Sequence, residues 1–136
     1  MMNLEKIKTA AAALAALFAL AHAVLGAGVT DEVKLNVARV KYGGGGDWYS
    51  DPSSLPNLLS EFSQRTGIET ASSEKVITLS SPELCRYPFL YMTGHGNIEL
   101  TQEETDALRD HLLNGGFLYA DDNYGMDRSF RRMVRK

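Results

Sequence analysis

The stretch Tyr87-Pro88-Phe89-Leu90-Tyr91-Met92-Thr93-Gly94-His95-Gly96 decides the fold class of this chain. Its first six residues form a short apolar run, the pattern of a strand that is covered on both faces of a sheet. The residues from Thr93 onward are polar or glycine. A buried strand that leads directly into such a loop is typical of a parallel α/β sheet, in which ligands bind beyond the carboxyl ends of the strands.

A helix and another strand are predicted on the C-terminal side of this run. Thr101 and Glu104 have the spacing of a capping box, which begins a helix. The predicted core face of this helix consists of Ala107, Leu108, Leu112 and Leu113. Residues 117–120 are apolar and predict the next strand, and either Asp122 or Asp127 is expected to begin a last helix.

A strand and a loop are predicted on the N-terminal side. Residues 33–42 alternate in the manner of a strand, but the apolar phase changes between Val37 and Ala38. A change of phase within a strand predicts a β-bulge there. Residues 43–51 are rich in glycine and form the loop that follows.

The next segment predicts a helix whose apolar face recurs every three or four residues. Pro56 suits its first turn and Gly67 its end. The predicted face consists of Leu55, Leu58, Leu59 and Phe62. Residues 68–79 predict one short strand and a loop. Because helices separate the strands, crossover connections and a mainly parallel sheet are expected, as in a flavodoxin-like three-layer α/β sandwich.

The N-terminus has the pattern of an export signal. Lys6 and Lys8 precede the uncharged, alanine-rich stretch 10–21, and Ala21-His22-Ala23 has the small-x-small form that signal peptidase cleaves. One alternative is an uncleaved membrane anchor, because residues 9–30 carry no formal charge and this run is long enough to span a bilayer. The other is a buried core helix.

Cleavage after Ala23 would divide the chain into three parts. We expect a signal peptide at residues 1–23, a short linker at 24–32 and the α/β domain at 33–136. The mature protein is then expected in the periplasm or cell envelope. Contact with a membrane is expected only through the N-terminal segment, if it stays uncleaved.

Charge and cysteine content exclude some classes of function. The formal net charge of −3 argues against a nucleic-acid-binding protein, which normally carries a basic surface. Cys85 is the single cysteine, so no internal disulfide can form, and it is expected to be a small packed residue. His111 lies on the charged helix and is expected to be solvated or partly packed.

Three polar clusters follow predicted strands. Since parallel strands point the same way, the loops after them are expected to share one edge of the sheet. The candidate ligand-binding residues at this edge are Gly45, Gly46, Asp47, Trp48, Tyr49, Gly94, Gly96 and Asn123. The candidate catalytic residues are His95, Asp121 and Asp122.

His95 is the strongest catalytic candidate, because flanking glycines expose its imidazole and histidine titrates near neutral pH. One of Asp121 and Asp122 is expected to orient it, and the other to cap the next helix. The alternative for His95 is a loop residue that hydrogen-bonds to backbone. No metal site is predicted, since Asp47 would be the only further ligand.

For the glycines at 43–46 and for Trp48 and Tyr49, a structural role explains the sequence as well as ligand binding does. Four consecutive glycines at 43–46 allow backbone amides to approach an anion, yet the run lacks both the dinucleotide-binding and the Walker pattern. A flexible hinge explains it equally well. Trp48 and Tyr49 are suited to stacking on a sugar or another flat ligand, or to packing within the loop.

Four linked segments resemble a bacterial family known as domain of unknown function 4159. They are Gly-Gly-Asp-Trp-Tyr (45–49), Tyr-Pro-Phe-Leu-Tyr-Met-Thr-Gly-His-Gly (87–96), Gly-Gly-Phe-Leu-Tyr-Ala-Asp-Asp (115–122) and Asp-Arg-Ser-Phe-Arg-Arg (127–132). The resemblance implies the fold group of class I glutamine amidotransferase-like and ThuA-like proteins, and no activity. It also implies that the chain holds the N-terminal portion of the domain, so that the sheet is incomplete at its C-terminal side.

The amidotransferase relatives use a cysteine nucleophile on a turn between strand and helix. Here Asp121, Asp122 and Asn123 follow the strand, so amidotransferase chemistry is not supported. We expect a module that binds a small molecule or an envelope protein, without a cofactor. The alternative is a hydrolase that uses His95 with Asp121 or Asp122, with or without a metal ion.

Overall fold

The structure is a computed structural model that describes residues 34–135. The predicted signal peptide and linker lie outside these residues. Within the described part of the chain, no helix is long and apolar enough to cross a membrane. Strands and helices alternate along it, as the sequence pattern predicts.

The strands form one four-stranded sheet in the order β2-β1-β3-β4, and every neighbouring pair is parallel. Their bounds are β1 Val37–Val40, β2 Lys75–Ile77, β3 Phe89–His95 and β4 Phe117–Tyr124. The predicted parallel sheet is therefore confirmed. Because all strands point the same way, the loops that follow them emerge at one edge of the sheet.

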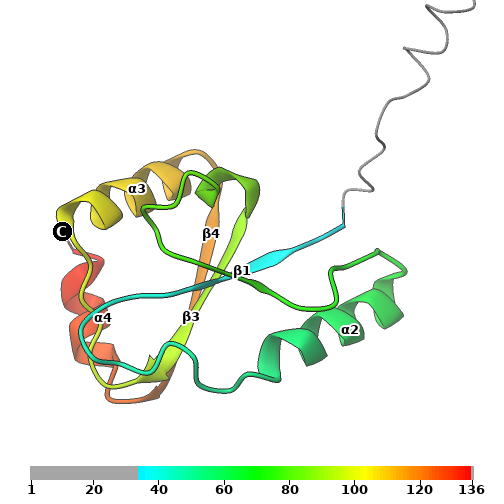
Figure 1. The fold of residues 1–136 in the computed structure, drawn as a ribbon, viewed down its shortest axis with the longest axis horizontal. Coiled ribbons are helices and arrows are strands. Elements are labelled where there is room, and N and C mark those ends of the chain that lie inside the picture. The colour runs from blue at the N-terminus through cyan, green and yellow to red at the C-terminus, as the bar shows by residue number, and fades with distance from the viewer. Residues whose placement is uncertain (1–33, 136) are drawn as a thin grey trace, which may run out of the picture. The chain divides into compact units, whose positions relative to one another are not determined.

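Helices cover both faces of the sheet, which gives the three layers of a flavodoxin-like sandwich (Figure 1). Helix α2, Ser54–Thr66, packs on one face, where its Leu55 and Leu59 join Val37 and Tyr91. Helices α3, Gln102–Leu113, and α4, Asp127–Met133, contribute to a larger core on the other face. The predicted capping box at the start of α3 is present.

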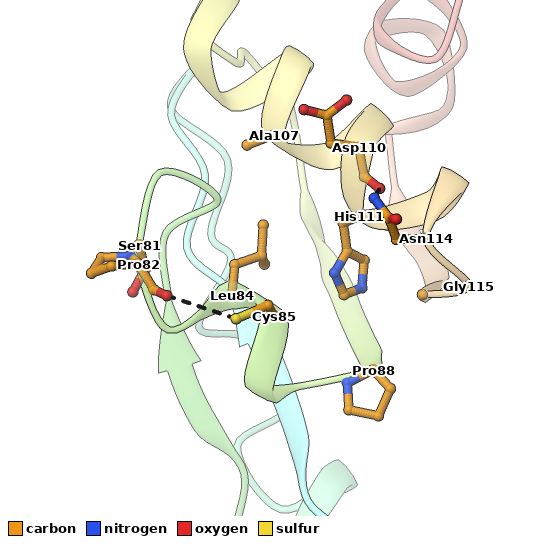
Figure 2. A pocket seen from close by; sticks show the side chains of 11 residues that line it. Ser81, Pro82, Leu84, Cys85, Pro88, Ala107, Asp110, His111, Asn114 and Gly115 are labelled. Carbon is orange, nitrogen blue, oxygen red and sulfur yellow. Dashed lines mark hydrogen bonds between the residues drawn. The ribbon is translucent and has the colours of Figure 1, made fainter.

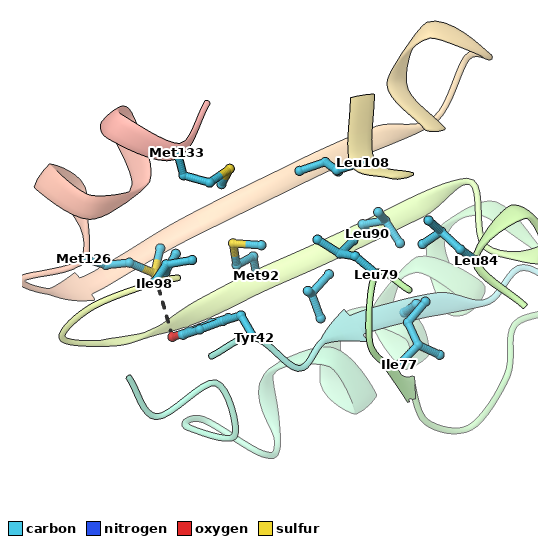
Figure 3. Close-up of a cluster of buried hydrophobic side chains, with 12 residues drawn as sticks. Tyr42, Ile77, Leu79, Leu84, Leu90, Met92, Ile98, Leu108, Met126 and Met133 are labelled. Atoms are coloured by element: carbon cyan, nitrogen blue, oxygen red, sulfur yellow. Dashed lines mark hydrogen bonds between the residues drawn. The ribbon is translucent and has the colours of Figure 1, made fainter. Parts of the chain in front are cut away.

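The larger core runs along β3 and between the helices of its face (Figure 3). Met92 and Leu90 of β3 are fully buried at its centre. The side chains around them include Ala38, Val40, Ile77, Leu79, Leu84, Ile98, Leu108, Met126 and Met133. Residues from strands, helices and the intervening loops thus share one apolar interior.

The predicted bulge in the first strand is wrong. All four residues of β1 are buried, and its register with β2 and β3 is unbroken. Ala38 and Val40 face the larger core, whereas Val37 faces α2. The change of apolar phase arises because both faces of a central parallel strand are covered.

The helix faces are narrower than predicted. Leu58 is half exposed, and Leu112 and Leu113 of the last turn of α3 are also exposed. The buried face of α3 consists instead of Thr105 and Leu108. These two residues are three positions apart, so both lie on the same face of the helix.

The second half of the sheet extends further than predicted. Strand β4 continues beyond Ala120 to Tyr124, because β3 continues to His95 and stays paired with it. Asp121 and Asp122 therefore lie within a strand and not in the loop after it.

Cys85 lies in a short 3-10 helix, Leu84–Arg86, and is exposed, so its prediction as a packed residue is wrong.

Candidate functional site at the carboxyl edge of the sheet

The loops after β1 and β3 are joined by backbone hydrogen bonds. The Gly46 N–H donates to the Asn97 carbonyl at 3.0 Å, and the Asp47 N–H donates to the His95 carbonyl at 3.2 Å. The Gly96 N–H in turn donates to the Tyr124 carbonyl at the end of β4. These bonds bring the three predicted loop clusters to the same edge of the sheet.

The glycines of this edge allow the loops to pack against each other. A Cβ at Gly46 would lie 2.7 Å from the Asn97 carbonyl oxygen, and one at Gly94 would overlap the Tyr42 hydroxyl. The Gly46 N–H is already paired with Asn97, so it is not free to bind an anion. Close packing therefore explains Gly46 and Gly94 without a bound phosphate and without a hinge.

Asp47 is the partner of His95. Its carboxylate accepts a hydrogen bond from the His95 backbone N–H, and its Oδ2 lies 3.0 Å from the ring Nδ1. Because an ionised carboxylate only accepts hydrogen bonds, Nδ1 is the donor in this pair. The pair leaves Nε2 as the second ring nitrogen, on a side chain that is 54% exposed.

The same contacts determine the charge of Asp47. The hydrogen bond from the His95 backbone N–H lowers the pKa of the Asp47 carboxyl, and the imidazole of His95 lowers it further. The carboxylate is therefore ionised at neutral pH. An ionised carboxylate fixes both the tautomer and the orientation of the imidazole beside it.

Asp122 has a structural task. Its two carboxylate oxygens accept hydrogen bonds from the backbone N–H groups of Met126, at 2.8 Å, and Asp127, at 2.9 Å. These are N–H groups at the start of α4, which lack partners within the helix. One of the two predicted aspartates therefore does cap the helix.

Neither aspartate is the carboxylate that contacts His95. Asp121 alternates with Asp122 along β4, so it lies on the opposite face of the sheet. The expected pairing of His95 with Asp121 or Asp122 is replaced by the pair with Asp47. The reason is topological: β1 and β3 are neighbours, so the loop after β1 reaches the end of β3.

Asn123 links the end of β4 to the loop after β1. Its side-chain amide donates to the Ser50 hydroxyl, at 3.1 Å, and to the Asp51 carboxylate. The Thr93 hydroxyl donates to the Asn123 side-chain oxygen at 3.5 Å. These contacts hold the loop after β1 to the end of β4, so Asn123 is a supporting residue of this edge.

The aromatic residues of the loop differ in exposure. Trp48 is half buried against the core, and Lys41 lies over its ring at 5.6 Å from the centroid. Tyr49 is 64% exposed and forms a T-shaped pair with Trp48. Trp48 therefore packs, and Tyr49 is the ring that faces solvent near Asp47.

Arg39 is a buried charge that the sequence pattern did not single out. It is 2% exposed in β1, and its Nε donates to the Glu74 carboxylate at 2.9 Å. Its remaining nitrogens donate to the loop after β1, at the carbonyls of Trp48, Ser50 and Asp51 and the hydroxyl of Ser54. Arg39 thus fixes the loop that carries Asp47. A charge inside a strand covered on both faces is the signal that could have revealed it.

No group of three or more histidine, cysteine, aspartate or glutamate side chains within residues 34–135 is arranged to hold a metal ion. Asp47 and His95 provide two ligands, whereas protein metal sites of this kind require three or four. The arrangement therefore offers an oriented imidazole and a carboxylate, which suit hydrogen bonding and proton transfer.

Tyr42 makes the edge sensitive to alkaline pH. Its hydroxyl donates to the Thr93 carbonyl at 2.9 Å, and burial, with the charges of Asp47 and Asp122, raises its pKa from 10.0 to about 12. A raised pKa favours the protonated phenol in the folded state. The protonated Tyr42 side chain therefore contributes fully to the free energy of unfolding below pH 10. This contribution is lost as the pH rises through 12.

We therefore expect Tyr42→Phe to flatten the decrease of the free energy of unfolding between pH 10 and 12. At pH 7 the substitution removes one hydrogen bond and should cost about 1 kcal/mol. Urea unfolding at a series of pH values measures both effects, with the exposed Tyr49→Phe as a control. An unchanged alkaline slope in the Tyr42 variant would contradict the assignment.

The comparison with protein-family models identifies a family that covers most of the chain. The family described as Domain of unknown function (DUF4159) matches residues 36–136, which include every loop of the site. The chain belongs to the DUF4159 family. No curated protein matches the chain. The pair of Asp47 and His95 therefore lies inside the DUF4159 domain, whose family description names no activity.

Proposed function

We propose that this DUF4159 domain binds a small polar ligand at the carboxyl edge of its sheet, with His95 as the main contact. The observation that carries the proposal is the Asp47 carboxylate 3.0 Å from Nδ1 of a ring that is 54% exposed. A carboxylate that fixes one ring nitrogen directs the other toward solvent as a preorganised hydrogen-bonding group. The exposed ring of Tyr49 supplies a nearby flat surface for the ligand.

The proposal predicts where ligands bind and what His95→Ala does. Because the Asp47 carboxylate also accepts a hydrogen bond from the backbone N–H of His95, the variant keeps that bond and should remain as stable as the parent. It should weaken binding about tenfold, the effect of losing one good hydrogen bond. The probes are flat sugars and heterocycles, N-acetylglucosamine and adenine among them, followed by amide chemical shifts.

The expected result is a set of shifts within residues 43–49 and 94–97 that disappears in His95→Ala. Asp47→Asn is the matched variant, because it retains the shape of the carboxylate without its charge. Shifts that map elsewhere, or that persist in both variants, would refute the proposed site. If His95→Ala instead mainly lowers the melting temperature, His95 is a structural loop residue.

A hydrolase is the second candidate, and the same pair favours it. An imidazole held by a carboxylate can accept a proton from a water molecule that attacks a substrate. In this version Asp47 orients His95, in the role first expected of Asp121 or Asp122. Hydrolysis of p-nitrophenyl acetate distinguishes the candidates: Asp47→Asn should reduce the rate about tenfold or more if the pair is catalytic. A rate equal to that of free imidazole would leave only the binding function.

We also propose that the chain is exported to the periplasm or cell envelope, on the strength of Lys6, Lys8 and the Ala21-His22-Ala23 triplet. N-terminal sequencing of protein from the cell envelope should give Val24 as the first residue. An intact Met1 in the membrane fraction would favour an uncleaved anchor, and an intact Met1 in the soluble cytoplasmic fraction would refute export.

The wider fold group is also a proposal. The parallel order β2-β1-β3-β4 with helices on both faces supports a place among the glutamine amidotransferase-like and ThuA-like α/β folds. The segment at the end of β4 offers Asp121, Asp122 and Asn123 and no cysteine. The proposal therefore concerns the fold and not amidotransferase chemistry.

A further inference from the structure

A separate cavity of about 410 Å³ lies at the opposite end of the sheet (Figure 2). Pro88, directly before β3, and Gly116, directly before β4, both line it, so it lies at the amino ends of the strands. The seven residues of β3 separate it from His95 by roughly 20 Å, at about 3.3 Å per residue. It is therefore distinct from the candidate site.

The walls of this cavity are largely apolar. Pro82, Leu84, Pro88 and Ala107 supply them, from the loop before β3 and from α3. Its volume lies within the range of roughly 300–1,000 Å³ that is typical of small-molecule pockets. Polar groups gather on one part of the lining, where α3 ends, with Asp110, His111 and Asn114 close together (Figure 2).

His111 is the residue that indicates a ligand. Its Nε2 is buried and has no hydrogen-bond partner among the described residues. The ring fits only because position 116 is glycine, since a Cβ there would overlap it. A buried polar atom without a partner destabilises the fold, whereas an apolar ring of similar shape would not. The ring is half-buried against Gly116, as predicted for a partly packed histidine, and its unpaired Nε2 is the additional feature that the structure reveals.

The surroundings of His111 restrict the chemistry of that ligand. Cys85 directs its thiol toward the Pro82 carbonyl, at 4.0 Å, and away from the imidazole, so the two do not form a catalytic pair (Figure 2). Within residues 34–135, no cluster of three or more histidine, cysteine, aspartate or glutamate side chains could hold a metal ion. Asp110 lines the cavity and neither lysine nor arginine does, which disfavours anions such as phosphates and carboxylates.

We propose that this cavity binds a small, neutral or cationic, mainly apolar molecule that forms one hydrogen bond with the imidazole of His111. The apolar walls hold the body of the molecule, and its single polar group pairs with the ring nitrogen that the fold leaves unpaired. In the structure Nε2 lies against Gly116, which itself lines the cavity, so the proposed binding requires the ring to turn about its χ2 angle until Nε2 meets the ligand. This site is independent of the pair formed by Asp47 and His95.

The test compares phenol with toluene, which has nearly the same shape without the hydroxyl, and with the anion benzoate. Binding to the full 136-residue chain is followed by amide chemical shifts. Phenol should bind about tenfold more tightly than toluene, and benzoate more weakly than phenol. His111→Phe should abolish the preference for phenol over toluene while the protein stays folded.

Two further variants make the result specific. Ala107→Leu narrows the cavity and should weaken phenol and toluene alike, whereas Tyr124→Phe, an exposed change at the other end of the sheet, should alter neither. The proposal is overturned if phenol and toluene bind the parent chain equally, if benzoate binds best, or if none of the three shifts amides that line the cavity. Because the first comparison uses the parent chain, it holds even if a variant fails to fold.

Discussion

Arg39→Met is expected to cost about 3–5 kcal/mol of the free energy of unfolding, the usual effect of removing one partner from a buried ion pair. The substitution leaves the Glu74 carboxylate, whose side chain is only 10% exposed, without its cation. It also removes the donors to the carbonyls of Ser50 and Asp51. Since domains are typically stable by about 5–15 kcal/mol, urea unfolding at pH 7 should show a large decrease in the midpoint.

Two control variants separate the ion pair from the contacts with the loop. Arg39→Lys retains the charge but lacks the planar fork that reaches several acceptors, so it should be intermediate in stability. Arg39→Met combined with Glu74→Leu removes both charges and should recover part of the loss. The recovery should be incomplete, because the loop carbonyls stay unpaired. A decrease below about 1 kcal/mol in Arg39→Met would show that the buried network contributes little.

The link from Arg39 to the site is the loop after β1. Arg39 binds this loop at Trp48, directly beside Asp47, and at Ser50. A variant that loosens the loop should therefore also displace the Asp47 carboxylate from the His95 ring. Binding at the carboxyl edge should weaken in Arg39→Lys more than its stability alone explains, which ligand titration under fully folded conditions measures.

The sequence was sufficient to predict the architecture because local signals decided it. The capping box at Thr101 and Glu104, the glycine that ends α2 and the apolar run before Thr93 each act over a few residues. Helices between strands then require crossovers, and crossovers require parallel strands. Because parallel strands all point the same way, the loops that follow them must lie at the same edge of the sheet.

Pairwise contacts across the sheet could not be predicted in the same way. Asp47 and His95 are separated by 48 positions, and their contact depends on β1 lying beside β3. Asp121 and Asp122 were the better candidates on the sequence because they directly follow an apolar run. Their polarity also concealed the end of β4, whose pairing with β3 carries the strand on to Tyr124. The environment of His111 likewise depends on two distant segments, at Pro88 and Gly116.

Gly94→Ala is expected to be the most damaging single-methyl change at the carboxyl edge. Gly94 has a φ of +146°, and a Cβ there would overlap the buried Tyr42 hydroxyl and lie 3.0 Å from the Asp47 side chain. Backbone strain and overpacking together should cost about 2–5 kcal/mol. Gly115→Ala provides the control, since Gly115 also has a positive φ but has no atom within 4 Å of the added Cβ.

The overlap with Tyr42 makes the prediction testable by a double-mutant cycle. Tyr42→Phe removes the hydroxyl that the new methyl group meets, so the double variant should be more stable than the sum of the single losses by at least about 1 kcal/mol. Thermal and urea unfolding of the four proteins give this coupling energy. Strictly additive losses would mean that strain at Gly94, and not contact with Tyr42, requires a glycine there. In the coupled case, Gly94→Ala should also shift the amide signals of Asp47 and His95, because the added methyl group displaces the carboxylate that orients the imidazole.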